Sequence, residues 1–79
     1  MTKIIKILGP DCDKCNRLYK TTVEAVRSTS VDAEISKVSK ISEIIAFGVM
    51  ATPAMVIDGH TVVSGHVPSL DEIKKLIAD

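Results

Sequence analysis

The two cysteines of this 79-residue chain, Cys12 and Cys15, are separated by two residues, and the sequence contains no other cysteine. Two thiols at this spacing can form a disulfide with each other or supply half of a tetrahedral metal site. They follow a short apolar segment and begin a stretch with helical periodicity, so we expect them at a strand-to-helix junction. There, unpaired N–H groups and the positive end of the helix dipole stabilise a thiolate.

The two thiols are expected to differ in role. Cys12 should lie outside the helix and act as the nucleophile, whereas Cys15 shares the buried apolar stripe and should act as the resolving thiol. Lys14 adds to stabilisation of the Cys12 thiolate. The carboxylates of Asp11 and Asp13 oppose it, each by roughly 0.7–2.8 kcal/mol at about 6 Å and an effective dielectric of about 80 to 20. The balance predicts a modestly lowered pKa for Cys12 and a reducing rather than strongly oxidising pair. Asp13 is equally well explained as a complement to the helix dipole.

A metal site in a single chain is disfavoured by the small number of ligands. Tetrahedral zinc needs four ligands, and besides the cysteines the chain offers His60 and His66, which lie at no recognised ligand spacing. We therefore expect no metal and no other cofactor, and we expect both histidines on the solvated surface. A dimer that pools four thiolates around zinc or an iron–sulfur cluster stays an alternative.

Composition excludes several other classes of function. Ten basic and ten acidic residues cancel and are scattered along the chain, which argues against nucleic-acid or anionic-membrane partners. The first eight residues are too short and too interrupted by lysine for a secretory or membrane-spanning segment. A close pair of cysteines in a cytosolic protein favours catalysis or metal binding over a structural disulfide. We expect a cytoplasmic, monomeric protein with one domain over residues 1–79.

Hydrophobic periodicity predicts an alternation of strands and helices in the order βαβαββα. We expect strands over 3–8, 31–38, 54–57 and 60–64, and helices over about 13–27, from an N-cap at Ser39 to a stop at Gly48, and from a capping box at Ser69. Asp58-Gly59 is a strong signal for a type I′ hairpin turn. The predicted class is α/β, with a four-stranded mixed sheet flanked by three helices.

This order resembles a minimal thioredoxin fold. The Cys12-Asp13-Lys14-Cys15 motif after the first strand, and Thr52-Pro53 before the hairpin, fall where thioredoxins and glutaredoxins carry their active-site cysteines and cis-proline. The chain is more closely similar to small thioredoxin- and glutaredoxin-like proteins of archaea and bacteria that are often labelled redox-active disulfide proteins. Three segments carry that similarity: Ile7-Leu8-Gly9, Gly48-Val49-Met50-Ala51-Thr52-Pro53-Ala54 and Val56-Ile57-Asp58-Gly59.

The resemblance implies a thiol–disulfide oxidoreductase with a redox-active Cys12–Cys15 disulfide. Thr52 and Pro53 would bind substrate, because the backbone before the cis-proline faces the reactive sulfur and can pair with an extended peptide. The implied partners are a disulfide-containing protein and an electron donor such as a thioredoxin-reductase-like enzyme. Glutathione as donor stays open, since the glutaredoxin Gly-Gly and the Pro-Tyr between the cysteines are missing.

One departure from the family concerns the proton of Cys15. Thioredoxins place a buried aspartate six residues before the first cysteine, where this chain has Lys6. A lysine cannot serve as the same base, so we expect a water molecule to take that part. The alternative function is a non-catalytic metal- or thiol-binding module, such as a metallochaperone or regulatory partner. A third is an interaction domain with a vestigial cysteine pair.

Overall fold

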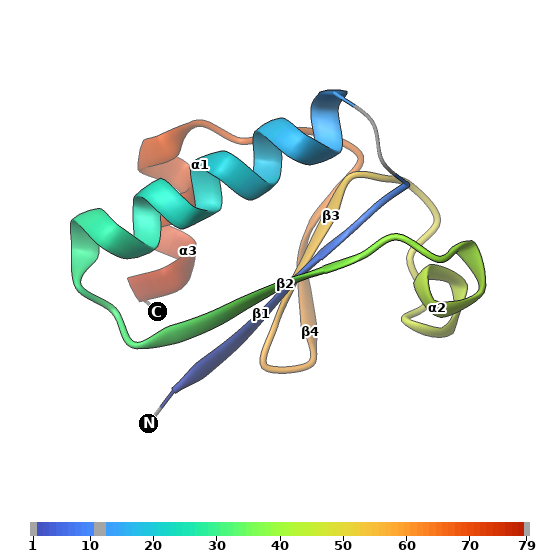
Figure 1. Cartoon of the computed structure of the whole chain (residues 1–79), viewed down its shortest axis with the longest axis horizontal. Coiled ribbons are helices and arrows are strands. Elements are labelled where there is room, and N and C mark those ends of the chain that lie inside the picture. Colours follow the sequence, from blue (N-terminus) through green and yellow to red (C-terminus); the bar gives the residue numbers. More distant parts are fainter. Residues whose placement is uncertain (1, 11–12, 79) are drawn as a thin grey trace.

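The computed structural model describes residues 2–10 and 13–78 of the chain (Figure 1). The predictions for Asp11 and Cys12 lie outside the described residues. The elements are β1 (Lys3–Leu8), α1 (Asp13–Thr29), β2 (Ala33–Val38), α2 (Ile41–Ala46), β3 (Ala54–Ile57), β4 (His60–Ser64) and α3 (Leu70–Ala78). Over the described ranges, this order confirms the predicted α/β class with its four-stranded mixed sheet and three helices.

The sheet has the strand order β2-β1-β3-β4, so β1 lies at its centre. β1 runs parallel to β2 and antiparallel to β3, and β3 and β4 form an antiparallel hairpin. The register places Ile7 beside Lys37 and Met55, and places Leu8 beside Ala54. Because side chains alternate between the faces of a strand, Ile7 and Lys37 share one face of the sheet and Leu8 and Ala54 the other.

Each face of the sheet carries its own apolar core. α1 and α3 lie side by side over one face, and the shorter α2 covers one end of the opposite face (Figure 1). The buried residues of the first core are Ile5, Ile7, Leu18, Ala25, Met55, Ile57, Val63, Ile73 and Ile77. Those of the second are Leu8, Ile44, Ala54 and Val56. The larger core therefore anchors α1, the helix that begins at the cysteine motif.

α1 is 17 residues long and extends two residues past the predicted end near Arg27. The hydroxyl of Thr29 donates to the carbonyl of Ala25 at 2.8 Å and so supports the last turn. The helix is followed by Ser30 in a left-handed conformation, with φ of 56°. Among the described residues, no helix combines the length and apolar character needed to cross a membrane.

The predicted start of the second strand at Val31 is wrong. β2 begins at Ala33, because its pairing with β1 starts where Ala33 lies opposite Lys3. The residue before it, Asp32, still accepts a hydrogen bond of 2.9 Å from the Lys3 N–H through its carbonyl. Val31 instead packs, partly buried, against the larger core.

The predicted N-cap of the second helix at Ser39 is also wrong. Lys40 occupies that position, with extended φ and ψ of −74° and 126° and no capping hydrogen bond from its side chain. Its carbonyl accepts the Ile44 N–H at 3.0 Å, so the backbone alone begins the helix. The predicted stop at Gly48 is confirmed, since Gly48 has φ of 79° and donates its N–H to the Ile45 carbonyl at 2.9 Å.

The hairpin and the last helix begin as the sequence predicts. Asp58 and Gly59 both have positive φ, 49° and 85°, as a type I′ turn requires. At the start of α3, the Glu72 N–H donates to Ser69 Oγ at 3.2 Å, which is the N-cap half of the predicted capping box. The Glu72 carboxylate accepts the Ser69 hydroxyl at 3.5 Å. These local signals fix the elements that follow the site.

α2 allows a direct test of how the second core is built, because two neighbouring isoleucines differ in burial. Ile44 is 5% exposed and Ile45 is 66% exposed. We predict that Ile44→Ala lowers the free energy of unfolding by about 2–4 kcal/mol, and that Ile45→Ala changes it by no more than about 0.5 kcal/mol. Urea unfolding under reducing conditions measures both, and equal losses would show that α2 does not seat Ile44 in the core.

Candidate active site at the start of helix α1

Cys15 lies in the first turn of α1 and is 4% exposed. It begins the buried stripe that continues through Leu18, Thr22 and Ala25, which repeats at helical spacing. The sequence-based expectation that Cys15 faces the core is therefore confirmed. Its role as the resolving thiol stays a prediction. The burial of this thiol prevents direct attack on a disulfide in a folded protein.

Gly9, directly after β1, is the point where three segments of the site meet. It is buried, and its N–H extends the β1–β2 pairing by donating to the Val38 carbonyl at 2.9 Å. An ideal Cβ on this residue would overlap Cys15 Sγ, and it would lie 3.3 Å from Cys15 Cβ and 3.7 Å from Thr52 Cβ. The missing side chain therefore lets the first turn of α1 close against the end of β1, with Thr52 of the loop before β3 alongside.

The close approach of Cys15 to Gly9 was not predicted from the sequence, in which Gly9 was noted only as part of the family resemblance. A usable signal was present. A glycine that directly follows a buried strand and precedes a cysteine motif marks a place where another segment approaches the backbone closely.

Thr52 and Pro53 lie in the loop that enters β3, beside this contact. Thr52 is exposed and Pro53 is buried, and the peptide bond between them is cis. The pairing of Leu8 with Ala54 holds the loop next to the end of β1. The Gly65 N–H donates to the Pro53 carbonyl at 2.9 Å from the other side. The structure thus brings Thr52 and Cys15 together, and the substrate-binding role of Thr52 and Pro53 stays a prediction.

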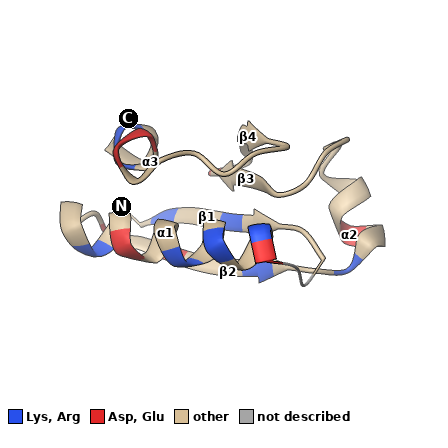
Figure 2. Cartoon of the chain, turned by 90° about the horizontal axis from the view of Figure 1, so that it is seen from above, with Lys and Arg blue, Asp and Glu red and all other residues tan. Residues whose placement is uncertain are grey.

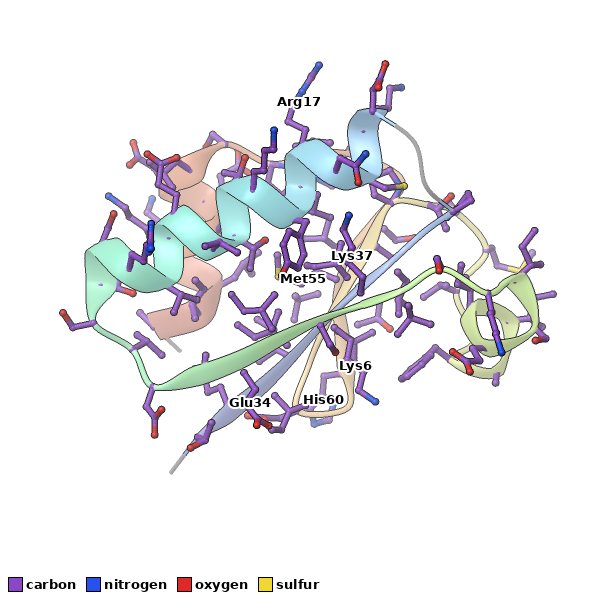
Figure 3. The ribbon with its side chains drawn as sticks, in the orientation of Figure 1. Lys6, Arg17, Glu34, Lys37, Met55 and His60 are labelled. Carbon is purple, nitrogen blue, oxygen red and sulfur yellow. The ribbon has the colours of Figure 1, made fainter. Side chains whose placement is uncertain are left out.

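The charged residues of the motif point to solvent. Asp13 and Lys14 are both exposed in the first turn of α1, and Figure 2 shows this acidic and basic pair at the start of the helix. Further along α1, the side chain of Arg17 points away from the sheet (Figure 3). Exposed charges are screened by water. The tuning roles assigned to Asp13 and Lys14 stay predictions.

The two histidines lie on the surface, as the sequence predicts. Both His60 and His66 are exposed, and His66 Nδ1 lies 3.3 Å from the Ser64 carbonyl oxygen. Within residues 2–10 and 13–78, no group of three or more His, Cys, Asp or Glu side chains is arranged to hold a metal ion.

A cleft of about 220 Å³ opens beside Cys15, between the first turn of α1 and the end of β2. Its lining residues are Ile7, Gly9, Pro10, Cys15, Asn16, Lys37 and Ser39. Lys37 donates to Asn16 Oδ1 at 2.6 Å and lies 5.0 Å from the centre of the Tyr19 ring. Sequence reasoning did not single out Lys37, because its place depends on the pairing of two strands 30 residues apart.

The two strands that follow Thr52 contain no charged residue. β3 and β4 carry no Lys, Arg, Asp or Glu, in contrast to α1 and β1 (Figure 2). In the loop that leads to Thr52, Met50 is 98% exposed. Met55, which follows the loop, is fully buried. A polypeptide that approached Thr52 would therefore meet the flexible, apolar side chain of Met50.

Comparisons with known proteins agree with this geometry. A family model described as a thioredoxin domain matches residues 3–78. The chain is similar to a thioredoxin of Methanocaldococcus jannaschii, with 42% identity over 72 residues that make up 91% of this chain and 83% of the relative. It is also similar to a thioredoxin of Methanothermobacter thermautotrophicus, with 36% identity over 74 residues, 94% of this chain and 96% of the relative.

The contact between Gly9 and Cys15 predicts an energetic coupling between the two positions. Gly9→Ala should lower the free energy of unfolding by about 1–3 kcal/mol in the reduced protein, because the new methyl group overlaps the Cys15 side chain. In a Cys15→Ala background the sulfur is gone, and the same substitution should cost less. A double-mutant cycle from urea unfolding should therefore give a coupling of at least about 0.5 kcal/mol. Additive effects would contradict the close approach.

Proposed function

Since the chain belongs to the thioredoxin family, we propose that it is a thiol–disulfide oxidoreductase that reduces or exchanges protein disulfides through Cys12 and Cys15. The observation that carries the proposal is the meeting of three segments at Gly9. It places the Cys15 sulfur against the end of β1 and beside the exposed Thr52. A buried thiol next to an exposed residue suits a resolving cysteine that lies beneath a bound substrate.

In the proposed reaction, the Cys12 thiolate attacks one sulfur of a substrate disulfide. That S–S bond breaks, one substrate sulfur leaves as a thiolate, and a mixed disulfide forms. Cys15 then loses its proton and attacks the Cys12 sulfur, which releases the second substrate thiolate and leaves a Cys12–Cys15 disulfide. Two electrons pass from the protein to the substrate. A thioredoxin-reductase-like enzyme or another thiol donor returns them, and glutathione is the alternative donor.

The proposed roles of Cys12 and Cys15 differ because Cys15 is buried. At 4% exposure, Cys15 cannot meet a substrate directly, so it acts only once a neighbouring sulfur has been modified. The substrate would lie as an extended segment along the exposed backbone at Thr52, a form of strand addition. Asp11, Asp13 and Lys14 would adjust the Cys12 thiolate from the solvent side. We place this activity in the cytoplasm, where thiols are kept reduced, in a monomer that needs no metal.

Serine substitutions should separate the roles of the two cysteines. Cys12→Ser should abolish reduction of insulin disulfides, because the nucleophile is lost. Cys15→Ser should stop turnover but accumulate a mixed disulfide on Cys12, which gel shift and mass spectrometry detect after reaction with an activated disulfide. Sustained turnover by Cys15→Ser with glutathione would instead show a monothiol mechanism. Stoichiometric zinc or iron in the purified protein would favour a metal-binding function.

Met50 allows a test of whether the loop before β3 forms an apolar rim that contacts substrate. Met50→Ala should raise the KM for insulin about fivefold, which corresponds to about 1 kcal/mol of lost apolar contact. The rate with a small aromatic disulfide should stay the same, because that reagent does not need the rim. Val62→Ala is the matched control, since Val62 is also an exposed apolar residue, at 37%, but lies in β4. Equal effects of both substitutions on insulin would contradict a rim at Met50.

A further inference from the structure

The outer face of α1 carries three cations close to the cysteine motif. Lys14, Arg17 and Lys20 follow one another at three-residue spacing, which keeps them on one side of the helix, and all three are exposed. Figure 2 shows the basic segments along α1, and Figure 3 shows that Arg17 points away from the sheet. At about 1.5 Å per residue, the row from Lys14 to Lys20 extends about 9 Å along the helix. We call these three residues the basic strip.

Two residues of the basic strip, Arg17 and Lys20, stand near carboxylates without pairing with them in the described part of the chain. Asp13 precedes Arg17 by four residues and Glu24 follows Lys20 by four, a spacing that allows ion pairs on a helix. Within residues 2–10 and 13–78, however, no hydrogen bond or ion pair holds the side chain of Arg17 or Lys20. The carbonyl of Arg17 accepts the Thr21 hydroxyl at 2.8 Å, which leaves the guanidinium uninvolved. Both cations are therefore available to a partner.

A groove along the basic strip adjoins the cleft beside Cys15. The groove has a volume of about 380 Å³ and is lined by Asp13, Asn16, Arg17, Lys20, Thr21 and Glu24. Asn16 also lines the cleft beside Cys15, so the two hollows meet at this residue. Lys20 follows Cys15 by five residues, about 7.5 Å along the helix axis. Because an extended peptide advances about 3.3 Å per residue, side chains about two to five positions from a substrate cysteine can reach the basic strip.

We propose that the basic strip binds carboxylates of the substrate, so that this protein prefers polypeptides with acidic residues close to their disulfide. The inference rests on the proposed oxidoreductase function and names the class of substrate that its site favours. Opposite charges raise the rate of encounter and orient the partner. Because the whole chain carries no net charge, the preference depends on the local strip. A nucleic acid would need a longer row of cations, and Asp13 and Glu24 would repel its phosphates.

Two peptide disulfides that differ only in charge test the preference. In one, glutamates occupy the second to fifth positions after the cysteine, and in the other glutamines replace them. At low salt the reduced protein should react about five- to tenfold faster with the glutamate peptide. High salt should remove the difference, because it screens exposed charges. Arg17→Gln with Lys20→Gln should lower the preference to about twofold or less, and Arg17→Lys with Lys20→Arg should keep it because both charges remain.

Arg27→Gln with Lys75→Gln is the matched control. It also removes one exposed arginine and one exposed lysine, but from the last turn of α1 and from α3. It changes the net charge equally and should keep the preference. The rate with a small uncharged disulfide should be the same in all variants, because the nucleophile itself is unaltered. Equal rates with the two peptides in the unsubstituted protein, or an equal loss of preference in the control variant, would overturn the inference.

Binding without exchange separates this inference from the proposed function. The glutamate peptide with serine in place of its cysteine cannot react, and at low salt it should shift the amide NMR signals of Arg17 and Lys20. The absence of these shifts would overturn the inference, whether or not the protein reduces disulfides. Shifts at the strip in a protein that reduces neither peptide would reject the proposed function alone. Displacement by a short single-stranded oligonucleotide but not by polyglutamate would assign the strip to nucleic acid and overturn the inference.

Discussion

The close approach of Cys15 to the backbone at Gly9 is the constraint on which the rest of the site depends. The first turn of α1 can sit against the end of β1 only because residue 9 has no side chain. That contact buries the sulfur, places it beside Thr52 and leaves the adjoining cleft toward β2. A single methyl group at this position would overlap the Cys15 sulfur, so the Cys15 side chain or the first turn of α1 would have to shift. The contact between Gly9 and Cys15 therefore both packs α1 against β1 and positions the thiol.

The alternation of side chains in β1 and β2 then divides the charged residues between two faces. Lys6 stands on the face covered by α2, over Phe47. Lys37 is exposed on the α1 face and lines the cleft beside Cys15. The lysine that this chain has where thioredoxins carry a buried aspartate therefore lies on the face of the sheet opposite α1 and Cys15.

Much of the fold could be predicted from the sequence, because its signals are local. The Asp58-Gly59 turn, the Ser69 cap and the Gly48 stop each depend on residues close together in the chain, and each is confirmed. The Ser39 cap failed because the backbone of Lys40 begins α2 without help from a side chain. Cys15 could be assigned to the buried face from helical periodicity alone. Gly9 and Lys37 could not be assigned roles, because their contacts depend on how strands and loops distant in sequence come together.

The most direct test of the proposed thiol–disulfide exchange is a balance of thiols and disulfides in a single reaction. Reduced protein is mixed with an equal amount of insulin without any other reductant, and both are analysed by mass spectrometry after thiol labelling. We expect each protein molecule to lose two hydrogen atoms and two reactive thiols, and the Cys12 and Cys15 peptides to become linked within one chain. An equal number of insulin thiols should appear. Protein thiols that stay unchanged, or a disulfide that links two chains, would contradict it.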